Sequence, residues 1–557
     1  MQHYFSSLIL ILFSAMLTAC GGSSAPINTE INLETSTENT LSAEEALPTE
    51  DTLSTDNTES TENTSDSHNS GLPQNWADSA TFIEIYVRAY KDSDGDGIGD
   101  LQGLTQQLDY LQEIGITGIW LMPITESSDN DHGYAVTDYQ NIESQYGTLE
   151  DFSTFLTEAH KRGIGVIMDY VINHASSSHP YFTASNNFDP TYRDWFIWED
   201  SNLGWQGWAG DSWHQGTHGY YYGAFWFGMP DWNLKNQEVI EFHKNNLRFW
   251  LDLGVDGFRF DAVGNLIENG ADRWYGEEAN HQINNTMRTL LEEEYFNKYL
   301  VCEDPGHPSD AAQSNSCGSA FAFGLNTAIF ESITNGSASE IAPYFSDFTL
   351  DKMALLLSNH DAFAGSRPFN QLNGNEPQLK LAASILMTLP GKPFIYYGEE
   401  VGMSAGNGLQ ADASLRVPMS WNSQGGFTTG SSFRTAAANK LEYNVRDEQH
   451  DSDSILSHYK NLMQMRINHP VMTSKNYGLV TAGDILHFYR YTGTTYAHII
   501  INMTNSSQNY TINTMQSDLS ITEIFPLQSS FIQTSNSNYL DINLLPFETK
   551  VIKYSLP

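Results

Sequence analysis

The sequence predicts an α/β protein built on a closed (β/α)8 TIM barrel, with a loop-rich domain inserted after the third strand and a C-terminal antiparallel β-sandwich. Short apolar runs alternate with amphipathic helical segments from Thr81 onward, which is typical of buried parallel strands joined by helices. Acidic residues follow several of these runs, where barrel enzymes place their catalytic groups. The alternation breaks at residues 175–230 and again after Lys475.

The expected barrel strands are short and almost entirely apolar. They cover residues 82–87, 118–121, 165–169, 257–261, 299–303, 355–358 and 393–397. Residues 149–162 and 239–253 have the spacing of amphipathic helices between them. Runs in this order predict about eight strands, the number that closes a barrel.

The breaks in the pattern set the expected domain boundaries. We expect the barrel to comprise residues 76–174 and 231–474. Residues 175–230 are rich in Trp, Tyr, His and Gly without a clear helical pattern, which favours an inserted, loop-rich domain B. Residues 475–557 contain short alternating segments separated by Asn, Ser and Thr turns, which predict a β-sandwich domain.

The N-terminus has the pattern of a secretion signal. Residues 8–17 form an apolar run too short to span a membrane, and residues 17–20 resemble the cleavage box of a bacterial lipoprotein. We expect residues 1–20 to be a lipoprotein signal peptide and Cys20 to be acylated, with an ordinary signal peptide as the alternative. The protein would then be anchored by lipid in the cell envelope, at the outer membrane or cell surface, or be secreted.

Residues 21–75 are rich in Ser, Thr, Asn and Glu and contain no aromatic residue, Lys or Arg. Such a segment buries too little apolar surface to fold, so we expect a disordered acidic linker. The formal net charge of the chain is -42, which excludes nucleic acid as a partner because phosphates would be repelled. Cys302 and Cys317 would pair in an oxidising compartment or remain buried thiols, and both possibilities stay open. We expect a monomer.

Three acidic residues follow expected strands and converge on one rim of the barrel. Asp261, Glu303 and Asp361 come after the fourth, fifth and seventh strands. Cleavage of a glycoside requires one carboxylic acid to protonate the leaving oxygen and a second carboxylate near the anomeric carbon. Arg259 lies two residues before Asp261, so both point to the same side of their strand and the cation keeps Asp261 ionised. The sequence therefore predicts a glycoside hydrolase.

The clusters at residues 169–174, 257–262, 303–304 and 358–361 resemble the four sequence regions of the α-amylase family of glycoside hydrolases. The resemblance extends over residues 82–421 and implies that Asp261 is the nucleophile, Glu303 the acid/base and Asp361 a stabiliser of the transition state. It also implies a set of residues that contact the glucose at the cleavage site, with Tyr134 stacked beneath it. These substrate-binding residues are Asp131, His132, Tyr134, His174, Arg259 and His360.

The chain departs from the starch-type α-amylases, which usually carry Lys and His where Gly264 and Asn265 stand. This departure affects one family calcium ligand and one sugar contact on the leaving side. Residues 229–233 resemble a family segment intermediate between oligo-1,6-glucosidases and neopullulanases, and Ala262 favours α-1,4 bonds. We expect a retaining, endo-acting α-amylase on starch, glycogen or maltodextrins. An exo-acting α-glucosidase or oligo-1,6-glucosidase, a transglycosylase and a non-catalytic glucan-binding surface protein are the alternatives.

Residues 92–100 have the oxygen spacing of a calcium loop. Gly103 stands where an EF-hand carries its final Glu, so the motif is incomplete, and an unmetallated Asp/Gly turn is the alternative. Similar loops occur on the oligo-1,6-glucosidase side of the family, where the calcium is structural. Asn173 is a weaker candidate for a second calcium. The expected ligands of the loop are Asp92, Asp94, Asp96, the carbonyl of Ile98, and Asp100.

Domain B contains aromatic residues that suit either stacking on sugar rings or packing of a loop-rich domain. For any single residue, packing is at least as plausible as sugar binding. They include Trp205, Trp208, Trp213, Tyr220, Tyr221, Tyr222 and Trp226.

Overall fold

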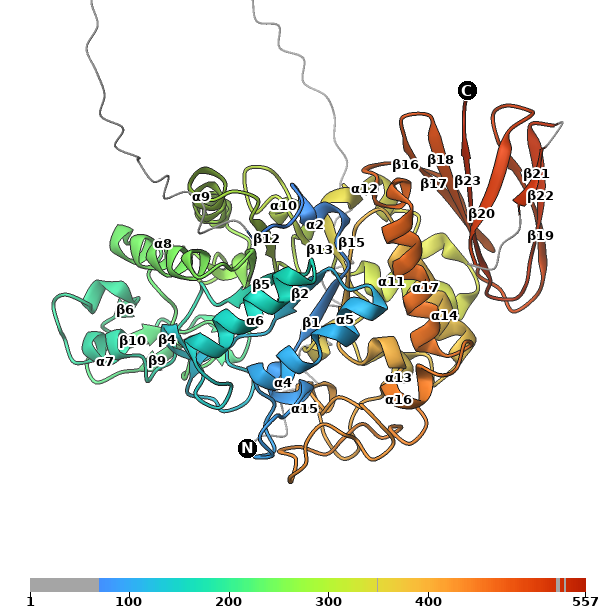
Figure 1. The fold of residues 1–557 in the computed structure, drawn as a ribbon. Helices are drawn as coiled ribbons and strands as arrows, with labels where there is room; N and C mark the ends of the chain where they lie inside the picture. The colour runs from blue at the N-terminus through green and yellow to red at the C-terminus, as the bar shows by residue number, and fades with distance from the viewer. Residues whose placement is uncertain (1–69, 348, 527–530, 535–536) are drawn as a thin grey trace, which may run out of the picture. The chain divides into compact units, whose positions relative to one another are not determined.

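The computed structural model describes residues 70–557, apart from residues 348, 527–530 and 535–536 (Figure 1). The predicted signal peptide, the lipidation of Cys20 and the predicted linker as far as residue 69 lie outside the described residues. The end of that predicted linker is folded, because Leu72 is buried and the carbonyl of Pro73 accepts a hydrogen bond from Asn297. Within the described part, no helix has both the length and the apolar character needed to cross a membrane.

Eight parallel strands close into the predicted TIM barrel in the order β1-β2-β5-β11-β12-β13-β14-β15. The expected runs overlap every barrel strand except β13, which is only two residues long and leaves no periodic signal. The run expected at residues 355–358 is displaced, because β14 ends at Leu355 and the run continues into the following loop. The strands are β1 (Phe82–Ile85), β2 (Gly118–Leu121), β5 (Gly165–Tyr170), β11 (Gly257–Phe260), β12 (Tyr299–Cys302), β13 (Ala320–Phe321), β14 (Met353–Leu355) and β15 (Lys392–Tyr396).

Helices surround the strands (Figure 1). The sequence sets their ends: at the start of α6 the Thr148 side chain accepts a bond from the Asp151 amide, and the Asp151 carboxylate accepts one from the Thr148 amide. The helices around the barrel bury one apolar stripe or, over residues 381–388, nearly every face. They are α4 (Leu101–Gln106), α5 (Leu108–Ile114), α6 (Leu149–Lys161), α8 (Gln237–Asp252), α9 (Glu278–Glu294), α11 (Leu325–Asn335), α14 (Glu376–Thr388) and α17 (Ile455–Asn468).

Aromatic side chains fill the barrel near the amino-terminal ends of its strands. Phe82 of β1 stacks on Phe394 of β15 with ring centroids 4.3 Å apart. Trp76 of α2 (Trp76–Ser79) packs on Phe82 at 5.5 Å. Gly118 is required beside them, because a Cβ there would lie 2.5 Å from the Phe82 ring. This end of the barrel is therefore a packed apolar layer.

The interior becomes polar two residues further along the strands. Glu84, Asp169 and Arg259 are buried on β1, β5 and β11. Since alternate residues of a strand share a face, these side chains occupy the next interior layer. The charged side chains of these three strands thus lie toward their carboxyl ends.

Domain B follows β5 and contains a sheet in the order β6-β10-β9 and a hairpin of β7 and β8. The segment also contains the short helix α7 (Pro180–Asn186), whose seven residues are too few to give a clear helical pattern in the sequence. An isolated β-bridge pairs His174 with Asp231 and joins the entry and exit of the domain. The strands are β6 (Trp198–Glu199), β7 (Gln206–Gly207), β8 (Gly210–Asp211), β9 (Trp213–Gln215) and β10 (Tyr220–Tyr222).

The C-terminal domain is the predicted antiparallel sandwich. One sheet has the order β16-β17-β18-β23-β20-β21 and the other pairs β19 with β22. Ile500 and Ile552 of the first sheet share a buried cluster with Ile512 and Leu540 of the second. The strands are β16 (Asn476–Ala482), β17 (Ile485–Thr492), β18 (Thr495–Asn502), β19 (Gln508–Asn513), β20 (Ser520–Phe525), β21 (Phe531–Thr534), β22 (Tyr539–Leu544) and β23 (Thr549–Ser555).

A disulfide joins Cys302 and Cys317, which settles the alternative that the sequence left open. Cys302 is the last residue of β12, so the bond ties the end of this strand to the loop that leads into β13.

Replacing Phe82 with Ala should destabilise the protein by about 3–5 kcal/mol, because the large ring leaves a cavity in a closed layer. Urea unfolding followed by tryptophan fluorescence measures the change. Phe296, which is 69% exposed, provides a matched control, and Phe296→Ala should change stability by less than about 0.5 kcal/mol. Equal unfolding midpoints for Phe82→Ala and the parent would contradict a tightly packed layer.

Candidate active site

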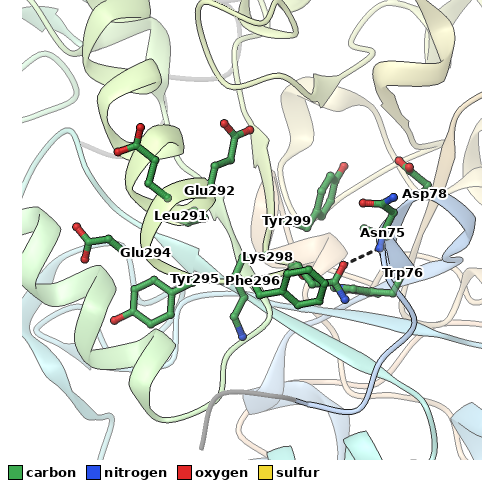
Figure 2. Close-up of a pocket in the computed structure, with 13 residues that line it drawn as sticks. Asn75, Trp76, Asp78, Leu291, Glu292, Glu294, Tyr295, Phe296, Lys298 and Tyr299 are labelled. Atoms are coloured by element: carbon green, nitrogen blue, oxygen red, sulfur yellow. Dashed lines mark hydrogen bonds between the residues drawn. The ribbon is translucent and has the colours of Figure 1, made fainter. Parts of the chain in front are cut away.

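A pocket of about 600 Å³ opens between α2 and the end of α9 (Figure 2). Tyr299, the first residue of β12, lines it, and the backbone amide of Asn75 donates a hydrogen bond to Asn297 at 2.6 Å. Glu303 follows the last residue of the same strand. The pocket therefore lies at the opposite end of the barrel from the predicted catalytic residues and is not the candidate active site.

Arg259 is the centre of the buried charged layer. Its Nη1 lies 2.9 Å from Asp169 Oδ1 and 2.7 Å from Asp261 Oδ1, and its Nη2 lies 2.9 Å from Glu303 Oε2. Nη1 and Nη2 belong to one planar guanidinium group, so the carboxylates of Asp261 and Glu303 lie side by side. The structure thus brings together the two carboxylates that the sequence predicts for catalysis.

Burial raises the pKa of both carboxyl groups, and Arg259 opposes the rise. The pKa of Asp261 reaches about 6, because Asp169 adds repulsion while bonds from Glu303 and Arg259 lower it. The pKa of Glu303 reaches about 7, because the charges of Asp261 and Asp361 add to burial. Glu303 therefore keeps its proton to a higher pH than Asp261. A proton donor beside an ionised carboxylate is the arrangement that acid-assisted bond cleavage needs.

The backbone beside Asp261 brings one more contact to Glu303. Ala262 has φ 51° and ψ 36°, a left-handed conformation that is uncommon outside glycine. Its amide donates to Glu303 Oε2 at 3.2 Å. Sparsely populated conformations of this kind cluster at functional sites, where the surrounding structure holds them.

His360 links the third predicted carboxylate to the barrel interior. Its Nδ1 lies 2.5 Å from Glu84, and its Nε2 lies 3.1 Å from Asp361 and 2.8 Å from the hydroxyl of Tyr134. Burial favours the neutral ring, but Asp361 and Glu84 outweigh burial and raise the pKa of His360 to about 10. Burial alone would raise the pKa of Asp361, yet His360 and Arg416 hold it far below its ordinary value. His360 is therefore cationic and Asp361 anionic near neutral pH.

Tyr134 and His174 also lie at this rim. The ring of Tyr134 stacks on His360 at 5.5 Å, and its hydroxyl donates to Asp169 at 2.8 Å. Burial lowers the pKa of His174 to about 3, so the ring is neutral. The ring also interacts with the backbone of Tyr134, which places the two predicted residues side by side. His132 instead turns toward Asp129, with 3.1 Å between Nδ1 and Oδ2.

Asp131 belongs to an ion-paired cluster that also holds Asp361. The Asp131 carboxylate lies 2.9 Å from Arg434 Nη2. It also accepts a hydrogen bond from the Tyr86 hydroxyl at 2.7 Å. Arg416 contacts Asp361 at 2.8 Å and approaches Asp131 to 3.9 Å. Sequence reasoning missed Arg416 and Arg434, which lie in a long loop without a motif. It also missed Glu84, whose only signal was one acidic residue inside an otherwise apolar strand.

The predicted calcium loop brings three carboxylates together. One oxygen each from Asp92, Asp94 and Asp100 lies within 4.8 Å of the others, and Asp92 is buried. Asp96 is not part of this group, and its carboxylate accepts the amide of Ile98 at 2.7 Å. An all-oxygen donor set suits a hard cation such as calcium, which neutralises the clustered charges.

A second group of buried oxygens surrounds Asn173 at the junction of the barrel and domain B. Asn173 Oδ1, Asp231 Oδ2 and Glu268 Oε1 have no hydrogen-bond partner among the described residues. Burial raises the pKa of Asp231 well above its ordinary value and that of Glu268 to about 8. A buried, all-oxygen set of this kind suits a hard cation.

Comparisons with known proteins agree with this geometry. Residues 84–475 match the model of the alpha amylase catalytic domain. The chain is 35% identical to alpha-amylase 3 of Dictyoglomus thermophilum over 71% of its own length and 79% of that protein. It is 30% identical to the oligo-1,6-glucosidase of Parageobacillus thermoglucosidasius, covering 86% of this chain and 99% of that protein. It is also 30% identical to a trehalose synthase/amylase of Mycolicibacterium smegmatis, over 71% of this chain and 77% of that protein.

Solved structures show the same fold. A mutant of isomaltulose synthase from Erwinia rhapontici, in complex with sucrose, aligns with a TM-score of 0.74 and 26% identity, over 87% of this chain and 100% of that one. The trehalose-6-phosphate hydrolase of Bacillus licheniformis aligns with a TM-score of 0.74 and 24% identity, over 86% of this chain and 100% of that one. From the matched catalytic domain and the relatives above, the chain belongs to the α-amylase family of glycoside hydrolases.

Proposed function

We propose that the protein is a retaining, endo-acting α-amylase that hydrolyses α-1,4-glucosidic bonds in starch, glycogen or maltodextrins. The observation that carries the proposal is the contact of Asp261 and Glu303 with one guanidinium group, that of Arg259. A pair held this close suits direct attack by one carboxylate, whereas inverting enzymes separate the pair to admit a water molecule. The similarity to an alpha-amylase at 35% identity favours α-1,4 bonds in glucans as the substrate.

In the proposed mechanism Asp261 attacks the anomeric carbon while Glu303 gives its proton to the leaving glycosidic oxygen. The glycosyl-enzyme ester on Asp261 is then hydrolysed by water, whose proton Glu303 accepts. Arg259 keeps Asp261 ionised, and its contact with Glu303 is retained when that group becomes charged. Asp361, held by His360 and Arg416, presents a negative charge to the positive character that develops on the sugar.

A second candidate is an exo-acting α-glucosidase or oligo-1,6-glucosidase. The cluster of Asp131, Arg416 and Arg434 favours it, because a fixed ion-paired group beside Asp361 would bound the site on that side. The 30% identity to an oligo-1,6-glucosidase over nearly its whole length favours it as well.

The proposed location, at a lipid-anchored position in the cell envelope or outside the cell, rests on the sequence of residues 1–20 alone.

We propose that Asp92, Asp94 and Asp100 hold a structural calcium ion, which would neutralise their charges and fix the loop after β1. The buried oxygens of Asn173 and Asp231 support a second ion between the barrel and domain B. Neither ion takes part in the proposed chemistry.

The products formed from starch, maltoheptaose, isomaltose and pullulan distinguish the two candidates. Endo action on α-1,4 bonds should give mixed short maltodextrins from starch and maltoheptaose, with little hydrolysis of isomaltose. Chromatography of early time points measures this, and the Glu303→Gln protein serves as the blank for contaminating activity. Glucose as the sole early product would favour the exo-acting candidate, and no hydrolysis of any α-glucoside would refute both.

The value of kcat/KM for maltotriose should be bell-shaped in pH. Activity requires Asp261 to be ionised, so it falls as the pH drops through about 6, and requires Glu303 to be protonated, so it falls as the pH rises through about 7. Glu399→Gln is a matched control, because burial raises the pKa of Glu399 to about 8 and the side chain bonds to Ser358 away from the pair. The Glu399→Gln protein should keep both the acidic and the basic limb of the pH profile. A flat wild-type profile between about pH 5 and 8 would contradict the assignment.

Asp92→Asn should remove one equivalent of bound calcium, measured by elemental analysis of gel-filtered protein. It should also lower the thermal midpoint by about 5 °C in calcium-containing buffer, since a ligand that binds only the folded state stabilises it. Asp484→Asn, which replaces an exposed acid of the C-terminal domain, should leave both quantities unchanged. An Asp92→Asn protein with the calcium content and midpoint of the parent would show that the loop binds no ion.

A further inference from the structure

Tyr275 is held in one position beside the residue that follows Glu303. A Cβ atom at Gly264 would lie 2.4 Å from the Tyr275 ring and 3.1 Å from Asp304 Oδ1, so only glycine leaves room for the ring. The Tyr275 hydroxyl donates to Asp304 at 2.6 Å and accepts the amide of Gly306 at 2.7 Å. Gly264 is one of the positions where the sequence departs from the starch-type α-amylases. The absence of a side chain there provides the space that Tyr275 occupies.

Two tryptophans extend this ring toward solvent. Trp208 lies in the turn between β7 and β8 of domain B, and Trp274 precedes Tyr275 in the loop after β11. The Trp208 ring packs edge-on against Trp274 and against Tyr275, with centroids 5.2 Å apart in both pairs. Trp208 is 38% exposed and Trp274 is half-buried. Two separate loops thus build one aromatic wall.

The position of this wall relative to Glu303 gives it a role. Tyr275 bonds to Asp304, the residue directly after Glu303 at the end of β12, so the wall stands beside the predicted acid/base. The group that protonates the leaving oxygen must face the departing sugar, so the leaving chain lies on the Glu303 side. Aromatic rings pack on the apolar faces of sugars, and half-exposed rings are free to do so. Trp213 and Tyr222 of domain B are buried and are therefore not free to pack on a sugar.

We propose that Trp208, Trp274 and Tyr275 bind the glucosyl unit on the leaving side of the cleaved bond, and so make the enzyme prefer glucan chains over leaving groups without a sugar. This inference rests on the proposed hydrolase function. The ligand class is a neutral sugar. The carboxylate of Asp304 next to the wall would repel a phosphorylated one, and the nearby Arg273 is already paired with Glu277 at 2.6 Å.

The test compares two substrates that differ in the leaving group. Trp208→Ala should lower kcat/KM for maltotriose by at least about fivefold, because a stacking surface is lost. Fluoride release from α-glucosyl or α-maltosyl fluoride, whose leaving group carries no sugar, should stay within about twofold of the parent. Trp208→Phe should recover most of the maltotriose activity. Phe296→Ala, an exposed aromatic at the other end of the barrel, should change neither rate.

Equal losses on maltotriose and on the fluorides would assign Trp208 a structural role and overturn the inference. Unchanged activity of Trp208→Ala on maltotriose would overturn it too, while leaving the hydrolase proposal standing. A parent protein that hydrolyses neither maltotriose nor the fluorides would refute the proposed function itself, and the inference with it.

Discussion

The contact of one buried guanidinium with three carboxylates is the interaction on which the rest of the site depends. Arg259 contacts Asp169, Asp261 and Glu303, which lie on or directly after three adjacent strands of the barrel. A buried charge is costly unless it is paired and hydrogen-bonded, so none of these groups would remain ionised here alone. β5, β11 and β12 are consecutive strands of the barrel, so their direct pairing supplies the partners. Fold and site are therefore coupled through a single side chain.

The two sides of the site differ in chemistry, and this difference frames substrate recognition. On the Asp361 side, Asp131, Arg416 and Arg434 form a fixed ion-paired cluster. On the Glu303 side, Tyr275 of the aromatic wall occupies the space that Gly264 leaves. A polar cluster recognises hydroxyl groups in defined positions, whereas aromatic rings tolerate several orientations of a sugar. For the proposed hydrolase, this arrangement suits strict selection of the glucose that binds Asp261 and looser selection of the chain that leaves.

Much of this was predictable because barrel geometry maps sequence order onto position. Strand ends share one rim, so Asp261, Glu303 and Asp361 had to approach one another once the strands were identified. β13 and α7 were not predictable, since elements this short show no period. Arg416 and Arg434 were missed because their contacts depend on how loops return over the rim, and Glu84 was missed because one acidic residue inside an apolar strand forms no pattern. Cys302 and Cys317 could not be assigned from spacing, because pairing depends on where the loop before β13 places the second sulfur.

The most direct test of the account is to trap the glycosyl-enzyme and find the residue that carries it. A 5-fluoro-α-glucosyl fluoride forms the ester with a retaining enzyme and slows its hydrolysis, so peptide mass spectrometry can locate the sugar. The account predicts a single labelled peptide with the fluorosugar on Asp261. A label on Glu303, Asp361 or another residue, or inactivation without any covalent label, would contradict it.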